Sequence, residues 1–234
     1  MKFIYTILLL CFCIIGMKPS FGQLASIHKK EIIQLIKANK EKLNNIEQLV
    51  VAINNNDSAD KAIVIALEKV NKKWKIKLGP VQASIGRTGF ALPGEKIEGD
   101  GKSPTGIFDL GQLYTYEARV KTSLPFIQTN SEDKWIDDPN HENYNTHIRG
   151  NTTAKSFEHL KLSSIDYKYC MVIEYNTQPI VKGKGSAIFF HLADEKFTPT
   201  SGCVAIPEKN MLDYLQWLDP KKKRAILLTS LNGL

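Results

Sequence analysis

Short runs of β-branched and aromatic residues, separated by Gly, Pro and Asn, fill most of the chain after residue 60. Apolar runs of this length, continuous or alternating with polar residues, predict β-strands. We expect strands at residues 62–70, 73–78, 81–86, 107–117, 169–176, 185–191 and 225–230. Residues 208–218 have helical spacing and follow Pro207, a residue suited to a first helical turn. The sequence therefore predicts a mainly β domain with some α structure.

The residues before this part follow a different pattern. Between residues 24 and 53, apolar side chains recur at three- and four-residue spacing with Lys and Glu between them. This spacing predicts one or two amphipathic helices. We expect a helical N-terminal appendage over residues 23–60, packed on a domain formed by residues 61–234. A chain of 234 residues is long enough for one sizeable core with such an appendage.

The first 22 residues have the features of a secretory signal peptide. Met1-Lys2 precedes an apolar run over residues 3–16, and small residues lie near Gly22. The run is too short to span a membrane comfortably. We therefore predict cleavage near Gly22–Gln23, export to the periplasm or cell envelope, and no stable membrane span afterwards. A retained anchor is the less favoured alternative, because Lys18 and Pro19 end the run early.

The charge balance restricts the partners that we expect. The formal net charge of +7 falls to about +5 when Lys2 and Lys18 leave with the signal peptide. A mild positive charge on an exported protein suits an anionic polymer of the cell wall. The chain lacks the clustered arginines that are typical of nucleic-acid binders, so we expect no nucleic-acid partner.

Two cysteines remain after removal of the signal peptide. Cys11 and Cys13 lie in its apolar run, whereas Cys170 and Cys203 lie in the mature chain. Cys170 is central in an expected strand, which favours a buried structural thiol. One disulfide between Cys170 and Cys203 is the competing interpretation in an oxidising compartment.

The stretch IFFHLADEKFTPTSGCVAIP, residues 188–207, contains a candidate nucleophile and base. A free thiol has a pKa of about 8.5, so a cysteine nucleophile needs a nearby base to form thiolate at neutral pH. His191 at a strand end can act as that base for Cys203. The Ser201-Gly202-Cys203 turn can present backbone N–H groups to an oxyanion. The alternative is that both side chains only fill space, as isolated Cys and His residues often do.

Three blocks, two of which overlap, resemble the L,D-transpeptidase (YkuD-type) catalytic domain. They are IGRTGFALPGEKIEGDGKSPTGIFDLG at residues 85–111, GKGSAIFFH at residues 183–191, and residues 188–207. The resemblance extends over roughly residues 61–231 and implies a β-rich, sandwich-like fold. It implies that Cys203 is the nucleophile and His191 its general base, with no metal and no organic cofactor. The implied partners are peptidoglycan stem peptides as donor and acceptor, joined through a thioester acyl-enzyme.

The sequence departs from the common family motif at two positions. Ser201 stands where the family usually has His, and Ala205 where it commonly has Arg. Because Arg is a natural carboxylate partner, its absence bears on substrate recognition, and Arg149 or Lys184 are candidates to compensate. Trp135 and Tyr144, with Arg149, are candidate substrate-binding residues, although packing under a long loop is equally compatible with the two aromatic residues.

Three other functions remain open at this point. Transfer of the acyl group to water would make the protein an L,D-carboxypeptidase. Another cysteine amidase of the cell wall is a further alternative, but papain-like enzymes place Cys before His in the chain. A non-catalytic wall-binding protein is the third alternative, supported by the two departures from the motif.

Overall fold

A computed structural model describes residues 21–55 and 59–231. The predicted signal peptide, residues 1–22, lies outside the described residues except for Phe21 and Gly22. The strands of the main sheet are β1 Gln48–Asn54, β2 Lys61–Val70, β3 Lys73–Ser84, β4 Gly106–Thr115, β5 Phe126–Gln128, β9 Tyr169–Ile173, β10 Phe189–Leu192, β11 Val204–Ile206 and β12 Arg224–Ser230. A second sheet contains β6 Asp133–Ile136, β7 His147–Arg149 and β8 Phe157–His159.

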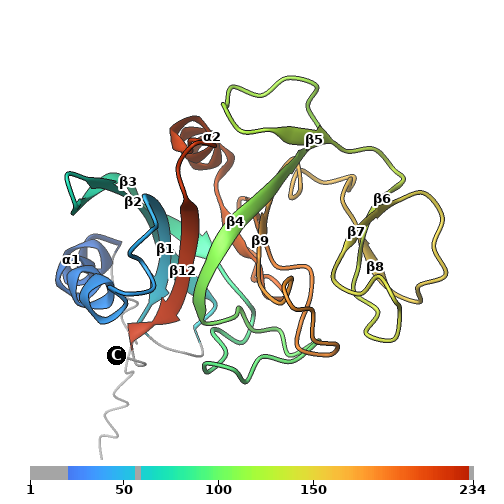
Figure 1. Cartoon of the computed structure of the whole chain (residues 1–234), viewed down its shortest axis with the longest axis horizontal. Helices are drawn as coiled ribbons and strands as arrows, with labels where there is room; N and C mark the ends of the chain where they lie inside the picture. The colour runs from blue at the N-terminus through green and yellow to red at the C-terminus, as the bar shows by residue number, and fades with distance from the viewer. Residues whose placement is uncertain (1–20, 56–58, 232–234) are drawn as a thin grey trace, which may run out of the picture.

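The main sheet closes on itself. Its strand order is β12-β1-β2-β3-β11-β10-β9-β4-β5, and β12 also pairs with β4 (Figure 1). This antiparallel pairing places Ile226 opposite Phe108, while the other edge of β12 runs parallel to β1. Eight strands thus form a barrel-like sheet without free edges at β12, and β5 extends it beyond β4. The mainly β prediction is confirmed, whereas the sandwich expected from the resemblance is wrong.

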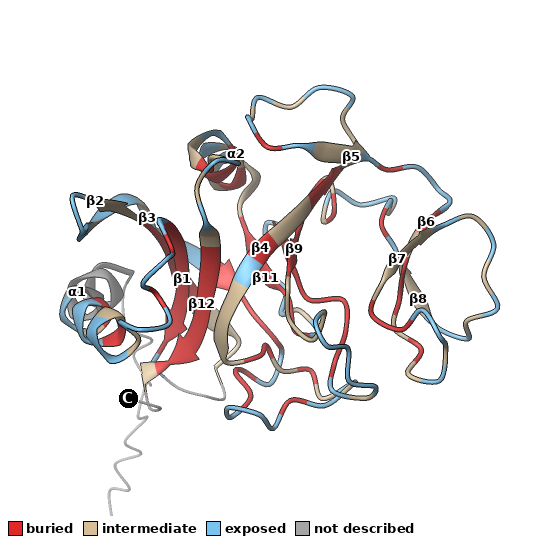
Figure 2. Ribbon diagram, in the orientation of Figure 1, coloured by how far each residue is buried: buried red, intermediate tan, exposed pale blue. Residues whose placement is uncertain are grey.

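The expected N-terminal helical region is only partly helical. Helix α1 runs over Phe21–Ala38, turns follow, and Gln48–Asn54 forms β1 between β12 and β2. The helical interpretation is therefore wrong for residues 48–54. Every residue of β1 is buried (Figure 2), because one face of the strand points into the barrel and the other packs under α1. A strand covered on both faces has a continuous apolar sequence, which a buried helix can share.

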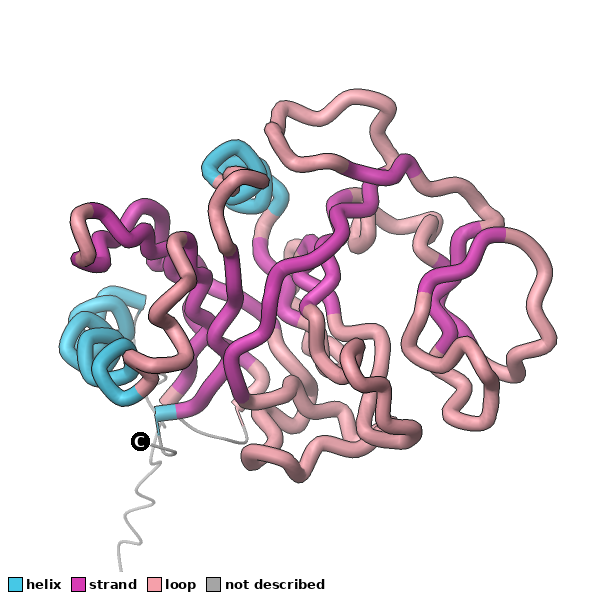
Figure 3. Tube along the Cα trace, viewed as in Figure 1, coloured by secondary structure: helices cyan, strands magenta, loops and turns pink. Residues whose placement is uncertain are grey.

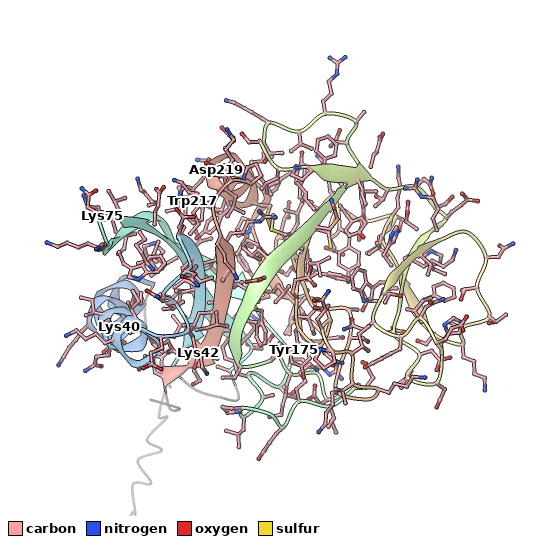
Figure 4. All side chains as sticks on the ribbon, in the orientation of Figure 1. Lys40, Lys42, Lys75, Tyr175, Trp217 and Asp219 are labelled. Carbon is pink, nitrogen blue, oxygen red and sulfur yellow. The ribbon has the colours of Figure 1, made fainter. Side chains whose placement is uncertain are left out.

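Helix α2, Glu208–Trp217, confirms the helix predicted after Pro207 and packs on the barrel core. The side chain of Gln48 ties the end of α2 to β1. Its Nε2 donates to the carbonyl of Trp217 at 2.8 Å, and its Oε1 accepts from the Asp219 N–H at 2.8 Å. Figure 4 labels Trp217 and Asp219 beside this end of the helix. In the described part of the chain, no helix is long and apolar enough to cross a membrane.

Long connections surround the second sheet (Figure 3). The predicted loop over residues 86–106 leads from β3 to β4, and the region predicted to be irregular, 118–160, contains only short strands. A cluster of buried side chains joins the second sheet to the barrel. It includes Trp135, Tyr167, Cys170, Phe189 and Cys203. The candidate nucleophile thus lies at the junction of the two sheets.

Candidate active site

His191 and Cys203 come from neighbouring parallel strands. In the β10–β11 ladder His191 lies opposite Ala205, and Cys203 immediately precedes β11. Successive side chains of a strand point to opposite faces of the sheet. Those of one face enter the barrel core: Phe190, Leu192, Val204 and Ile206. His191, Ala205 and Cys203 therefore share the other face, and all three line one cavity of about 500 Å³.

The Cys203 thiol is held in its protonated form. Its S–H donates to the carbonyl of Ala187 at 3.3 Å, and its sulfur accepts from the Phe189 N–H at 3.3 Å. Burial raises the pKa of the Cys203 thiol well above its usual range, and the charge of Glu158 raises it further. The Phe189 N–H and the Lys96 charge act in the opposite direction. These surroundings disfavour a standing thiolate, so a nucleophilic Cys203 would need a base.

His191 has the protonation state of such a base. Its Nδ1 lies 2.9 Å from the carbonyl of Leu192, an acceptor, so Nδ1 carries the proton and Nε2 keeps a lone pair. Burial lowers the pKa of His191, against opposing contributions from the Leu192 carbonyl and Asp166. The ring of Tyr167 lies edge-on to the imidazole at 5.1 Å. These contacts fix a neutral imidazole at one side of the cavity.

The thiol and the imidazole are near each other but not bonded. Among the residues that the structure describes, no hydrogen bond joins Cys203 Sγ to His191, since Sγ bonds the backbone of Ala187 and Phe189 instead. Cys170 and Cys203, the two cysteines among the described residues, are both free, so the competing Cys170–Cys203 disulfide is absent. A proton transfer from Cys203 to His191 would require the Cys203 side chain to leave these two backbone partners.

The glycine-rich loop holds the turn that carries Cys203. The Arg87 N–H donates to the carbonyl of Thr200 at 2.8 Å, and the Thr200 N–H donates to the carbonyl of Ile85 at 2.9 Å. The buried hydroxyl of Ser103 donates to the Cys203 carbonyl at 3.3 Å, and that of Thr200 does so at 2.7 Å. These bonds explain why the block at residues 85–111 accompanies the Cys203 motif in the sequence.

Carboxylates line another part of the cavity. Glu158 of β8 accepts a hydrogen bond from the Tyr167 hydroxyl, and Glu98 accepts one from Ser186 at 2.7 Å. Burial raises the pKa of Glu158 to about 7, with Asp137 and Glu98 adding to the increase and Tyr167 opposing it. Burial also raises the pKa of Asp137, and the charge of Glu98 raises it further. This part of the cavity favours a cationic group such as an ammonium.

Of the two predicted oxyanion residues, Ser201 lines the cavity and Gly202 does not. Ser201 accepts a hydrogen bond from Arg87 at 3.2 Å. The Gly202 N–H donates to the Thr200 hydroxyl at 3.1 Å and must leave it before it can bind an oxyanion. A Cβ at position 202 would lie 2.8 Å from the Lys102 carbonyl oxygen, at a φ of +151°, so this position requires glycine. The oxyanion role of the turn remains a prediction.

The three predicted substrate-binding residues do not line the cavity. Arg149 forms a two-pronged ion pair with the buried Asp133, at 2.9 and 3.0 Å. Tyr144 is buried and donates to Glu98, while Trp135 is buried and donates to Asn145 at 2.9 Å. The structure thus places the two aromatic residues behind the cavity wall. Lys184, the other candidate to replace the motif Arg, is also absent from that wall.

Sequence reasoning missed Arg87, Glu158 and Tyr167. Arg87 lies in the quoted glycine-rich block, and its position there beside Gly86 was an available signal. Glu158 and Tyr167 are single polar residues in irregular sequence, where no spacing distinguishes them. Only the folded chain shows that Tyr167 contacts both Glu158 and the His191 ring, and that all three line the cavity of Cys203.

Comparison with known proteins identifies the family of the chain. Residues 51–226 match the family described as YkuD, the L,D-transpeptidase catalytic domain. The match includes most of the chain, so the protein belongs to this family. No curated protein matches the sequence. The chain is also similar to the crystal structure of the helical cell shape determining protein Pgp2 from Campylobacter jejuni, at 16% identity and a TM-score of 0.41. That similarity covers 80% of this chain and 51% of the Pgp2 chain, so the chain spans about half of its length.

Proposed function

We propose that the protein is an exported, cysteine-dependent L,D-transpeptidase that acts on peptidoglycan stem peptides in the cell envelope. The observation that carries the proposal is the placement of His191 and Cys203 on one face of adjacent strands, at one cavity. Membership of the L,D-transpeptidase family supports the reaction class. The export step rests on the signal peptide predicted for residues 1–22.

The first half of the reaction forms an acyl-enzyme. Nε2 of His191 takes the proton of the Cys203 thiol, and the sulfur attacks the carbonyl carbon of the third stem residue. The carbonyl oxygen becomes an oxyanion, for which the turn at residues 201–203 is the predicted source of N–H donors. When the C–N bond breaks, the imidazolium returns its proton to the departing amine. A terminal D-amino acid leaves, and a thioester remains on Cys203.

The second half transfers the acyl group to an amine. A neutral amine of a second stem peptide attacks the thioester carbon, and the C–S bond breaks as the new amide forms. The proton lost by the amine passes to His191 and then to the departing sulfur, which restores the neutral pair. The carboxylates Glu98, Asp137 and Glu158 favour the approach of an ammonium-bearing acceptor to the cavity. Attack by water instead would release the peptide and make the protein an L,D-carboxypeptidase.

The test follows the acyl group by mass. Mature protein is incubated with a stem tetrapeptide, and intact-mass spectrometry is expected to show a tripeptide adduct on Cys203 together with a released D-amino acid. Cys203→Ala should form no adduct, whereas Cys170→Ala, a matched removal of the other thiol, should form it. An adduct in Cys203→Ala would contradict the mechanism, and binding without any adduct in the unmodified protein would favour a wall-binding function.

An added acceptor separates transfer from hydrolysis. With a second, labelled stem peptide present, the transpeptidase should yield a cross-linked product in preference to free tripeptide. Free tripeptide alone, even at high acceptor concentration, would instead indicate the carboxypeptidase. A carbapenem is a useful second probe, because acylation of Cys203 by its ring carbonyl needs no acceptor at all.

A further inference from the structure

We propose that Arg87 binds a carboxylate of the stem peptide next to Cys203 and so determines which peptides are substrates. The inference rests on the proposed function and extends it to a residue outside the family motif at residues 188–207. It assigns to the glycine-rich loop the cation that the chain lacks at position 205, where Ala follows the nucleophile by two residues.

The backbone of Arg87 is fixed to the nucleophile turn. Its N–H donates to the carbonyl of Thr200 at 2.8 Å, and Gly86 forms a bridge with Thr200. Its guanidinium then donates from Nη1 to the Ser201 hydroxyl at 3.2 Å, two residues before Cys203. Arg87 and Cys203 line the same cavity. A carboxylate held by this guanidinium therefore lies in the same cavity as the thiol that attacks the peptide bond.

The Arg87 guanidinium is held in place by hydrogen bonds, and no carboxylate among the described residues neutralises its charge. Its hydrogen bonds go to neutral oxygens, those of Ser201 and of the Gly99 carbonyl at 3.3 Å. Within residues 21–55 and 59–231, no ion pair involves Arg87. The side chain crosses Gly101, where an added Cβ would lie 2.6 Å from the guanidinium carbon, at a φ of +69°. Glycine at position 101 thus leaves room for the arginine beside the cavity.

Two other candidate cations, Lys96 and Arg149, are already paired with carboxylates. Lys96 also lines the cavity, but it is 4% exposed and pairs with Asp100 at 2.8 Å. Arg149 is bound to Asp133 by two prongs and lies outside the cavity wall. The described cavity wall contains one arginine, Arg87, and one lysine, Lys96. Of these two, Arg87 is the one without a carboxylate partner.

These charges define the chemical class of the ligand. A guanidinium presents a planar fork of donors that matches a carboxylate, which makes such pairs both strong and directional. Elsewhere in the cavity the carboxylates of Glu98, Asp137 and Glu158 repel an anion. The bound group is therefore a free carboxylate near the scissile bond. It belongs either to the terminal D-amino acid that leaves or to the side chain of the residue before it.

Binding measurements in the Cys203→Ala background test the inference without turnover. The probes are a stem tetrapeptide and two analogues, one amidated at the C-terminus and one at the side-chain carboxylate of the third residue. We expect Arg87→Gln to weaken binding of the free peptide by about 10–100-fold, the range of a charge-assisted hydrogen bond. It should not weaken binding of the analogue whose amide removes the recognised carboxylate. The analogue whose binding is unaffected by Arg87→Gln identifies which of the two carboxylates Arg87 binds.

Two further variants control for charge and folding. Arg119→Gln removes an exposed arginine that does not line the cavity, and it should bind all three peptides like the parent protein. Arg87→Lys keeps the charge but loses the fork, and it should give intermediate affinity. Thermal unfolding of each variant verifies that it is folded. Equal affinity of Arg87→Gln and the parent for the free peptide, or an equal loss for all three peptides, would overturn the inference.

Failure of the inference is distinguishable from failure of the proposed function. If the unmodified protein forms the Cys203 adduct and Arg87→Gln makes no distinction among the peptides, only the role of Arg87 is wrong. If no adduct forms and carboxylate binding still depends on Arg87, the catalytic proposal is wrong and the binding site stands.

Discussion

Cys170 and Cys203 lie in one buried cluster yet have different surroundings. Cys170 is 0% exposed and is the second residue of β9, opposite Tyr114 of β4. Cys203 is 5% exposed and precedes β11 at the cavity. Burial is the largest cause of a raised pKa for both thiols, and Glu158 raises both. The difference between them is access to a cavity and to an imidazole, so burial and pKa alone do not identify a nucleophile.

The largest effect should come from removing His191, the proposed base of Cys203. His191→Ala is expected to slow formation of the Cys203 adduct by about 10²–10⁴-fold, the usual contribution of a general base. The measurement is the rate of adduct formation by intact mass. His159→Ala, which removes an exposed histidine from β8 outside the cavity, should have little effect. Equal rates for His191→Ala and the unmodified protein would refute the assignment.

The alkylation rates of the two thiols should also differ, with Cys203 reacting about a hundredfold or more faster than Cys170. Iodoacetamide reaches Cys203 through the cavity, whereas Cys170 reacts only after the barrel opens, which costs much of the free energy of unfolding. Peptide mapping after timed labelling of the folded protein measures both rates. Comparable rates would show that access is not what distinguishes the two cysteines. In denaturant, both should react equally, which controls for the reagent.

The pH dependence of Cys203 labelling should reveal its raised thiol pKa. Because only thiolate reacts, the rate should rise about tenfold per pH unit and continue past pH 8.5, where an ordinary thiol levels off. Glu158→Gln should speed labelling several-fold at pH 8, where the carboxyl is charged. It should have little effect at pH 6, below its pKa of about 7. Glu142→Gln, at an exposed position, is the control, and a plateau near pH 8 would contradict the expectation.

The smallest effect concerns stability. The pKa of Glu158 is about 7 in the folded protein and about 4.5 when unfolded. Between pH 4.5 and pH 7, the carboxyl of Glu158 therefore stays protonated in the folded state but loses its proton in the unfolded state. Stability therefore falls as pH rises from about 4.5 to 7. The unfolding free energy of the unmodified protein relative to Glu158→Gln should drop by roughly 1–3 kcal/mol across this window. Urea denaturation at pH 5 and pH 8 measures the change, and a constant difference would exclude this role.

Much of the fold followed from local pattern. Short apolar runs bounded by turn residues predict the strands at residues 62–70 and 107–117, and helical spacing predicts the helix after Pro207. These patterns depend on neighbouring residues in the sequence alone. Other features depended on distant partners. Residues 48–54 are apolar on both faces because α1 covers a closed sheet, which makes strand and helix alike in sequence. Closure itself depends on the pairing of β12 with β4, which no local pattern encodes.

The candidate site shows the same division. His191 and Cys203 were found because their chemistry needs a particular pair of residue types, and the structure brings both to one cavity. Arg149 is a candidate substrate-binding residue from its charge alone, but in the structure it is bound to Asp133, 16 residues earlier in the chain. Its replacement, Arg87, reaches the site through a backbone bond to Thr200, across 113 residues of sequence. Which charges are neutralised is a property of tertiary pairing.

The position of β12 has a consequence for assembly. Among the described strands β12 comes last in the sequence, and it supplies a neighbour to both β1 and β4. Until it docks, those two strands present unpaired rows of backbone amides, the arrangement that invites aggregation. The barrel is therefore closed only when a strand that follows all of its neighbours in the sequence has docked between β1 and β4.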